Sequence, residues 1–228
     1  LYAIRWQWES LTYRQDHTMT TRSKLWLTSF TLYAVFFCWY TDFRAPLTEQ
    51  EIDEFVAVRL ADGADPAQIA RAEDLFRGDT GRQFLMFNAI DYNETPDDVE
   101  GAEPGSSAEE LMALYMQYML PAMLARGSHP VIMGDTFSGA MDLVGIDGAE
   151  EWDSGAVLRY RSRRTLMDII GNPEFRSDWH FKHAALTKTI AFPIETQLYL
   201  GDLRWILGLL MLAVTALLDA FVFTKKSA

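Results

Sequence analysis

The chain has 228 residues and a formal net charge of -12, and this charge excludes nucleic acid as an expected partner. Its single cysteine, Cys38, excludes an internal disulfide and a multi-cysteine metal site. A hydrophobic content of 49% and an aromatic content of 13% are high for a protein that is soluble throughout. We therefore expect one domain that is joined to a lipid bilayer.

Residues 1–23 precede the first apolar run. A stripe of apolar residues recurs at helical spacing in this segment: Leu1, Ile4, Trp8 and Leu11. This pattern favours an interfacial helix that lies on a membrane. Met19 would also be a natural start of translation, and a start upstream of residue 1 is an equal alternative.

Two apolar runs account for most of the hydrophobic content. Residues 25–40 contain no charged side chain, and residues 205–223 contain only Asp219. Because a helix needs about 20 apolar residues to cross a bilayer, we predict transmembrane helices over 24–43 and 203–223. The first run can also be interpreted as a signal sequence, since basic residues precede it.

Charge is distributed unevenly around these two predicted helices. Residues 42–202 contain 29 acidic and 13 basic residues, a net charge of -16, whereas the two ends of the chain together carry +4. Cytoplasmic flanks of membrane helices are enriched in Lys and Arg. We therefore expect both termini in the cytoplasm and the central domain outside it, in the periplasm of a bacterial inner-membrane protein. The basic tail, residues 224–228, also offers Asp219 a nearby positive charge.

Residues 44–82 are predicted to form a helical neck between the membrane and the domain. Thr48 and Glu51 form a capping box at the start of one helix. Asp65, followed by Pro66, begins a second helix.

Residues 83–198 are predicted to form a domain of alternating strands and helices. The predicted strands are 84–90, 131–133 with a continuation toward 142, 156–161 and 190–198. The predicted helices are a long one capped by Ser107 that runs through residue 124, one capped by Ser162 and broken at 171–173, and one over 175–187. The order strand, helix, strand, strand, helix, strand predicts an α+β domain of the ferredoxin-like, or split βαβ, class. Such a sheet carries helices on one face, so we expect a partner on the other.

Three short motifs follow one another in the second half of this domain. They read LRY at 158–160, SR at 162–163 and NPEF at 172–175, and a histidine-containing helix follows at 179–186. In order and spacing, residues 83–197 resemble the dimeric α/β-barrel superfamily, most closely its small uncharacterised families. The resemblance implies a barrel built from two sheets, within a homodimer or with a related α/β partner. It implies little about activity, because this fold carries unrelated reactions.

Four arginines lie within six positions, at Arg159, Arg161, Arg163 and Arg164. Strand alternation puts Arg159 and Arg161 on one face of the sheet and Ala156, Leu158 and Tyr160 on the other. Arg163 and Arg164 fall in the first turn of the next helix, where the helix dipole disfavours cations. The cluster is interpreted either as a site for an anion or an acidic partner, or as a set of surface salt bridges.

His180 and His183 lie three residues apart on one predicted helix, which makes them candidate polar groups for a ligand. No third ligand lies at motif spacing, so no metal is predicted, and a polar edge of a packed helix is the alternative. The acidic loop 91–103 lacks EF-hand spacing. No cofactor is predicted either, since the sequence has no phosphate-binding glycine loop, zinc-protease motif or nucleophile elbow.

Two functions are compatible with these patterns. The first is a membrane-anchored, non-catalytic accessory or scaffolding subunit of a larger integral-membrane complex, for example a bioenergetic one, that acts through protein–protein contacts. The second is a membrane-bound enzyme or carrier that binds a small apolar or aromatic ligand in a dimeric barrel. Its candidate polar groups are Arg159, Arg161, His180 and His183. A barrel interior filled by strand side chains would leave no room for the second function.

Overall fold

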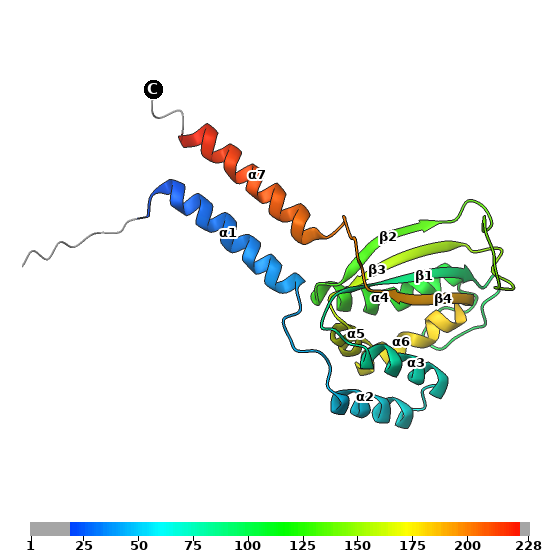
Figure 1. The fold of residues 1–228 in the computed structure, drawn as a ribbon. Coiled ribbons are helices and arrows are strands. Elements are labelled where there is room, and N and C mark those ends of the chain that lie inside the picture. Colours follow the sequence, from blue (N-terminus) through cyan, green and yellow to red (C-terminus); the bar gives the residue numbers. More distant parts are fainter. Residues whose placement is uncertain (1–18, 224–228) are drawn as a thin grey trace, which may run out of the picture. The chain divides into compact units, whose positions relative to one another are not determined.

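The computed structural model describes residues 19–223 of the chain (Figure 1). Within that range the side chains of residues 174–178 are not described. Residues 1–18, with their apolar stripe, and the basic residues 224–228 lie outside the described part of the chain. The expectations for these two end segments therefore stay predictions.

The chain divides into two compact units. The first is formed by Leu1–Tyr33 and Leu207–Ala228 and contains most of helices α1 (Thr21–Tyr40) and α7 (Leu203–Phe223). The second unit, Ala34–Ile206, contains the sheet and the remaining helices.

The two helices of the first unit contact each other through polar side chains. Arg22 donates to Asp219 Oδ2 through Nε at 3.0 Å and through Nη2 at 2.7 Å. Thr215 Oγ1 donates to Ser29 Oγ at 2.8 Å. Because Arg22 lies near the start of α1 and Asp219 near the end of α7, the helices are antiparallel neighbours. Asp219 thus has a cationic partner on the other helix, a contact that the sequence pattern did not predict.

Within residues 19–223, α7 is the one helix that is long and apolar enough to cross a membrane. Of the two predicted transmembrane helices, length and composition therefore support the second, 203–223, and not the first. In α1 the apolar residues alternate with Thr, Ser, Trp and Tyr. These side chains, together with the charged Lys24, lower the mean hydropathy of α1, which explains the difference.

The second unit contains a four-stranded antiparallel sheet in the order β2-β3-β1-β4. The strands are β1 (Phe84–Tyr92), β2 (His129–Asp135), β3 (Ser154–Tyr160) and β4 (Leu186–Ile194). The predicted α+β class and the predicted order of strands and helices are confirmed.

Several strand boundaries differ from the prediction, most clearly in the second and fourth strands. The second strand does not continue toward residue 142 but ends at Asp135, beside Ser154 at the start of β3. The fourth strand is Leu186–Ile194 rather than 190–198. It begins earlier because β1 extends to Tyr92, and Leu186 pairs with that residue. Strand ends are thus set by the length of the neighbouring strand, which local sequence does not reveal.

Helices α4 (Ala108–Ala125), α5 (Arg163–Ile170) and α6 (Pro173–Ala184) lie along one face of the sheet (Figure 1). The Ser107 and Ser162 side chains accept hydrogen bonds from main-chain N–H groups at the starts of α4 and α5, as predicted. The core between these helices and the sheet includes Phe84, Leu111, Met119, Met123, Tyr160, Ile169 and Phe181.

Helices α2 (Glu49–Ala61) and α3 (Pro66–Arg77) begin at the predicted caps. They were expected to form a separate neck. In the structure Ile52 and Phe76 are almost fully buried in the same core as the sheet residues. These helices are therefore part of the domain core.

The opposite face of the sheet exposes apolar side chains on its outer strands. Ile132 on β2 is 63% exposed, and Ile190 and Phe192 on β4 are 44% and 45% exposed. The Phe192 ring stacks on Phe87 of β1 with 5.6 Å between the ring centroids. This face therefore offers an apolar surface for contact with another molecule.

Candidate functional site

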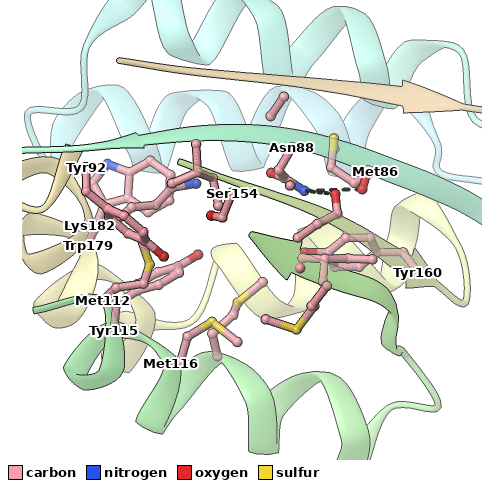
Figure 2. Close-up of a pocket in the computed structure, with 18 of the residues that line it drawn as sticks. Met86, Asn88, Tyr92, Met112, Tyr115, Met116, Ser154, Tyr160, Trp179 and Lys182 are labelled. Carbon is pink, nitrogen blue, oxygen red and sulfur yellow. Dashed lines mark hydrogen bonds between the residues drawn. The ribbon is translucent and has the colours of Figure 1, made fainter. Parts of the chain in front are cut away.

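A cavity of about 480 Å³ lies between the sheet and the helices that cover it. Strands β1 and β3 supply most of one wall, and α4 and α6 supply most of the other (Figure 2). Small-molecule sites commonly have volumes of about 300–1,000 Å³. The cavity is therefore large enough for a small organic ligand.

The strand wall of the cavity follows from alternation of side chains along β1 and β3. Met86 and Asn88 point to the cavity from β1, and the register places Leu158 and Ala156 of β3 beside them. Because side chains two residues apart lie on one face of a strand, Tyr160 also reaches the cavity. The face predicted for Ala156, Leu158 and Tyr160 is thus the cavity face.

Methionine and aromatic side chains dominate the lining. The methionines are Met86, Met112, Met116, Met119 and Met133, and the large aromatic residues are Tyr92, Tyr115, Tyr160 and Trp179. On α4 the methionines and Tyr115 recur at intervals of three and four residues, which puts them on one face of the helix. Methionine side chains are flexible and polarisable, so such a lining adapts to apolar ligands of different shapes.

A few polar groups interrupt this apolar lining. Burial raises the pKa values of Tyr115 and Tyr160, so both phenols stay protonated at neutral pH and can donate hydrogen bonds. The Tyr160 ring is held by stacking on Phe84, with 5.2 Å between the centroids. Asn88 Nδ2 donates to the carbonyl oxygen of Met86 at 3.2 Å (Figure 2).

Lys182 of α6 is the cationic side chain among the cavity residues. Its Nζ lies 5.2 Å from the Trp179 ring centroid and 5.7 Å from the Tyr115 ring centroid, within the range of cation–π attraction. Burial lowers the pKa of this ammonium group. Within the described part of the chain no carboxylate forms an ion pair with Lys182. The cavity therefore combines apolar walls with a partly buried positive charge.

No protein-family model and no curated protein matches this sequence. Among solved structures, the chain is similar to RPA0582, a protein of unknown function from Rhodopseudomonas palustris. The two share 18% sequence identity, with a TM-score of 0.47 over 60% of this chain and 96% of the other. The structure of the methylated RPA0582 protein gives 19% identity and a TM-score of 0.48 over 61% and 96% of the respective chains. These comparisons concern the fold of part of the chain and name no family.

Arg159 lies on the face of β3 that points away from the cavity, and its side chain is fully buried. Its guanidinium donates to Tyr40 O at 2.9 Å, to Gln83 Oε1 at 2.8 Å and to the carbonyl oxygen of Gly127. It also stacks over the Tyr40 ring, with Cζ 3.5 Å from the centroid. The expectation of an exposed ion pair is therefore wrong for Arg159.

The other three arginines of the cluster also contact the domain. Arg161 Nη1 donates to Trp39 O at 3.0 Å, and Arg164 donates to the carbonyl oxygens of Ala45 and Pro46, each at 3.0 Å. These bonds join the end of α1 and the segment that follows it to the start of α5. Arg163 Nη2 lies 3.8 Å from a carboxylate oxygen of Glu195. Anion or partner binding at this cluster stays a prediction.

The two candidate histidines lie outside the cavity lining. His180 Nε2 lies 2.8 Å from the carbonyl oxygen of Glu100, and the His183 ring contacts the edge of Trp179 with 5.1 Å between the centroids. No group of three or more His, Cys, Asp or Glu side chains suited to a metal ion is found among the described residues. Both histidines are therefore placed on the outer side of α6.

Lys182, between these two histidines, was missed by the sequence reasoning. The available signal was its spacing of three residues from Trp179, which puts an aromatic ring and a cation on one side of the helix. The methionines of α4 have the same helical spacing whether they fill a core or line a space. Only the three-dimensional packing shows that space remains between them and the sheet.

Proposed function

We propose that this protein is a membrane-anchored domain that binds a small, mainly apolar or aromatic molecule. The observation that carries the proposal is the cavity between the sheet and α4, with its methionine and aromatic lining. Concave, apolar sites with a few convergent polar groups are the usual form of small-molecule sites. The protein would then either carry this ligand or catalyse a reaction on it. Lys182 and the phenols of Tyr115 and Tyr160 are the polar groups in the cavity that could take part.

Blocking the cavity tests this proposal. Met116 of α4 lines the cavity, and Met116→Trp would fill part of its volume. We expect the full-length protein in lipid nanodiscs to bind a small aromatic probe such as 6-fluoro-2-naphthamide, observed by fluorine NMR, and the variant to bind it at least tenfold more weakly. Equal binding by both proteins, or no binding by either, would contradict the proposal.

The membrane anchor in this proposal consists of both α1 and α7. Large apolar side chains of both helices are exposed, among them Phe30 and Val35 of α1 and Leu209 and Phe221 of α7. A charged residue in a membrane helix needs a partner, and the contact of Asp219 with α1 satisfies this need. Lipid around both helices accounts for the exposed apolar surface.

The proposed topology has both termini in the cytoplasm and residues 43–203 in the periplasm of a bacterial inner membrane, since the chain ends are basic and the centre is acidic. Protease added to sealed spheroplasts is expected to degrade the domain. Protection in intact spheroplasts, followed by cleavage after lysis, would show the reverse orientation.

We further propose that the domain is ferredoxin-like and that its apolar sheet face packs on a second copy or a related α/β domain, as in dimeric α/β barrels. The antiparallel strand order and the exposed Ile132, Ile190 and Phe192 support this assembly. Phe192→Glu would place a charge in that contact. Sedimentation of detergent-solubilised protein should show an assembly for the wild type and a monomer for the variant; a monomeric wild type would refute the arrangement.

A second candidate function is an accessory subunit of a larger integral-membrane complex. The observation that favours it is the loop between β2 and β3, in which Phe137 and Met141 are fully exposed and Val144 is 83% exposed. Several large apolar side chains exposed on one loop are typical of a protein contact. Purification in mild detergent is expected to retain partner proteins with the wild type and to lose them with Phe137→Ser/Met141→Ser. Partner proteins that stay bound to the double variant would exclude this loop as the contact.

A further inference from the structure

Lys182 gives the cavity a chemical preference that its apolar walls alone would not have. The residue projects from α6 beside Trp179 and reaches the same space as Tyr115 and Ser154 (Figure 2). Two aromatic rings hold the ammonium group, at 5.2 and 5.7 Å from Nζ to the centroids. Cation–π contacts orient a cation but leave its hydrogen-bond donors available, because ring faces accept no conventional hydrogen bond.

Among the described residues, no carboxylate forms an ion pair with the Lys182 ammonium group. The acidic side chain of the cavity lining, Asp135, is exposed at the end of β2. A buried or partly buried charge is stable when it is paired, and a bound anion would provide the missing partner. Among the described residues, the cavity therefore has an apolar volume and one positive charge on its wall with which no carboxylate forms an ion pair.

We infer that the ligand of this cavity is an aromatic or aliphatic molecule that carries an anionic group, such as a carboxylate, which pairs with Lys182. The inference rests on the proposed ligand-binding function and specifies the class of ligand. The apolar part of the molecule lies among the methionines of α4 and the strand residues, and the protonated phenols of Tyr115 and Tyr160 are further donors for its polar end.

An acidic groove next to the cavity is the main feature that opposes an anionic ligand. Tyr92 and Asp135 line both spaces, and the groove also contains Glu94, Glu109 and Glu151. These three glutamates are exposed, so water and salt screen them. A direct contact with Lys182 in an apolar site is screened much less. The groove therefore reduces the rate of entry more than it weakens the bound state.

Two isosteric probes test the inference on the full-length protein in lipid nanodiscs. The probes are 6-fluoro-2-naphthoate, which is anionic, and 6-fluoro-2-naphthamide, which is neutral; empty nanodiscs measure their partition into lipid. We expect the wild type to bind the naphthoate about tenfold more tightly than the naphthamide, because hydrogen bonds to charged groups are stronger than neutral ones. Lys182→Met should abolish this preference and leave naphthamide binding unchanged within about twofold.

The matched control is Lys188→Met. Lys188 also carries a charge near an aromatic ring, 4.9 Å from the Trp152 centroid, but it does not line the cavity. This variant should keep the preference for naphthoate. Equal affinity of the wild type for both probes, or an unchanged preference in Lys182→Met, would overturn the inference and leave the proposed function standing. Failure of both probes to bind, or full binding by Met116→Trp, would overturn the proposed function as well.

Discussion

Replacement of Arg159 by alanine tests whether this buried arginine joins remote parts of the domain. The side chain is fully buried, and its guanidinium holds the carbonyl oxygens of Tyr40 and Gly127 and the side chain of Gln83. Burial lowers the pKa of Arg159 to about 10, so the group remains charged at neutral pH. Alanine would remove the donors and leave their acceptors buried.

The expected loss of stability follows from these contacts. Each stranded carbonyl group costs about 1–3 kcal/mol, and the lost contact with the Tyr40 ring about 1 kcal/mol more. Relief of the buried charge offsets part of this loss. We therefore expect Arg159→Ala to lower the free energy of unfolding by about 3–5 kcal/mol, compared with the 0–1 kcal/mol typical of an exposed ion pair.

Thermal unfolding followed by circular dichroism measures this difference on the full-length protein in detergent. For a chain of this size the loss corresponds to a fall in Tm of about 6–20 °C. The matched control is Arg82→Ala, because the Arg82 side chain is 77% exposed and makes one 3.4 Å contact with Glu195. We expect the control to change stability by less than about 0.5 kcal/mol. Equal melting temperatures for the two variants would refute the structural role of Arg159.

Three further predictions concern other contacts. Gly127→Ala should destabilise the domain by about 2 kcal/mol or more in the same assay, because the glycine has φ +66° and an added Cβ would lie 2.6 Å from a carbonyl oxygen of α1. The hydrogen bond from Arg164 lowers the pKa of Glu51 to about 2, so its stabilising effect is present above pH 4.5 and is lost as the pH falls toward 2. Between pH 5 and pH 3, Tm should thus fall more for the wild type than for Glu51→Gln, and parallel profiles would contradict this assignment. Arg22→Leu should weaken cysteine cross-linking between α1 and α7, because it leaves the charge of Asp219 unpaired. The double variant Arg22→Leu/Asp219→Leu leaves no unpaired charge and should restore the cross-linking. A double variant that cross-links as weakly as the single one would argue against the ion pair.

Local signals in the sequence were sufficient to predict where helices begin. The side chains of Thr48, Ser107 and Ser162 cap α2, α4 and α5 as predicted, because an N-cap hydrogen bond joins residues two or three positions apart. Strand alternation likewise placed Leu158 and Arg159 on opposite faces. These features need no knowledge of the rest of the chain.

Contacts between remote segments could not be predicted in this way. Arg159 and Tyr40 are 119 residues apart, and no local pattern shows that a main-chain carbonyl of α1 reaches this guanidinium. An arginine in an acidic chain was therefore interpreted as a surface residue. The cavity was missed for a related reason, since Met116 and Met119 have the same helical spacing whether they fill a core or line a space.

Strand β3 shows why the arginine cluster and the cavity are separate features despite their overlap in sequence. Leu158 and Tyr160 line the cavity, whereas Arg159 between them points to the opposite side, toward the end of α1. Because consecutive side chains of a strand lie on opposite faces, a change at Leu158 alters the cavity wall without removing a contact to Tyr40. A change at Arg159 removes that contact without altering the cavity lining. The lining of the cavity and the attachment of the end of α1 therefore depend on alternate residues of one strand.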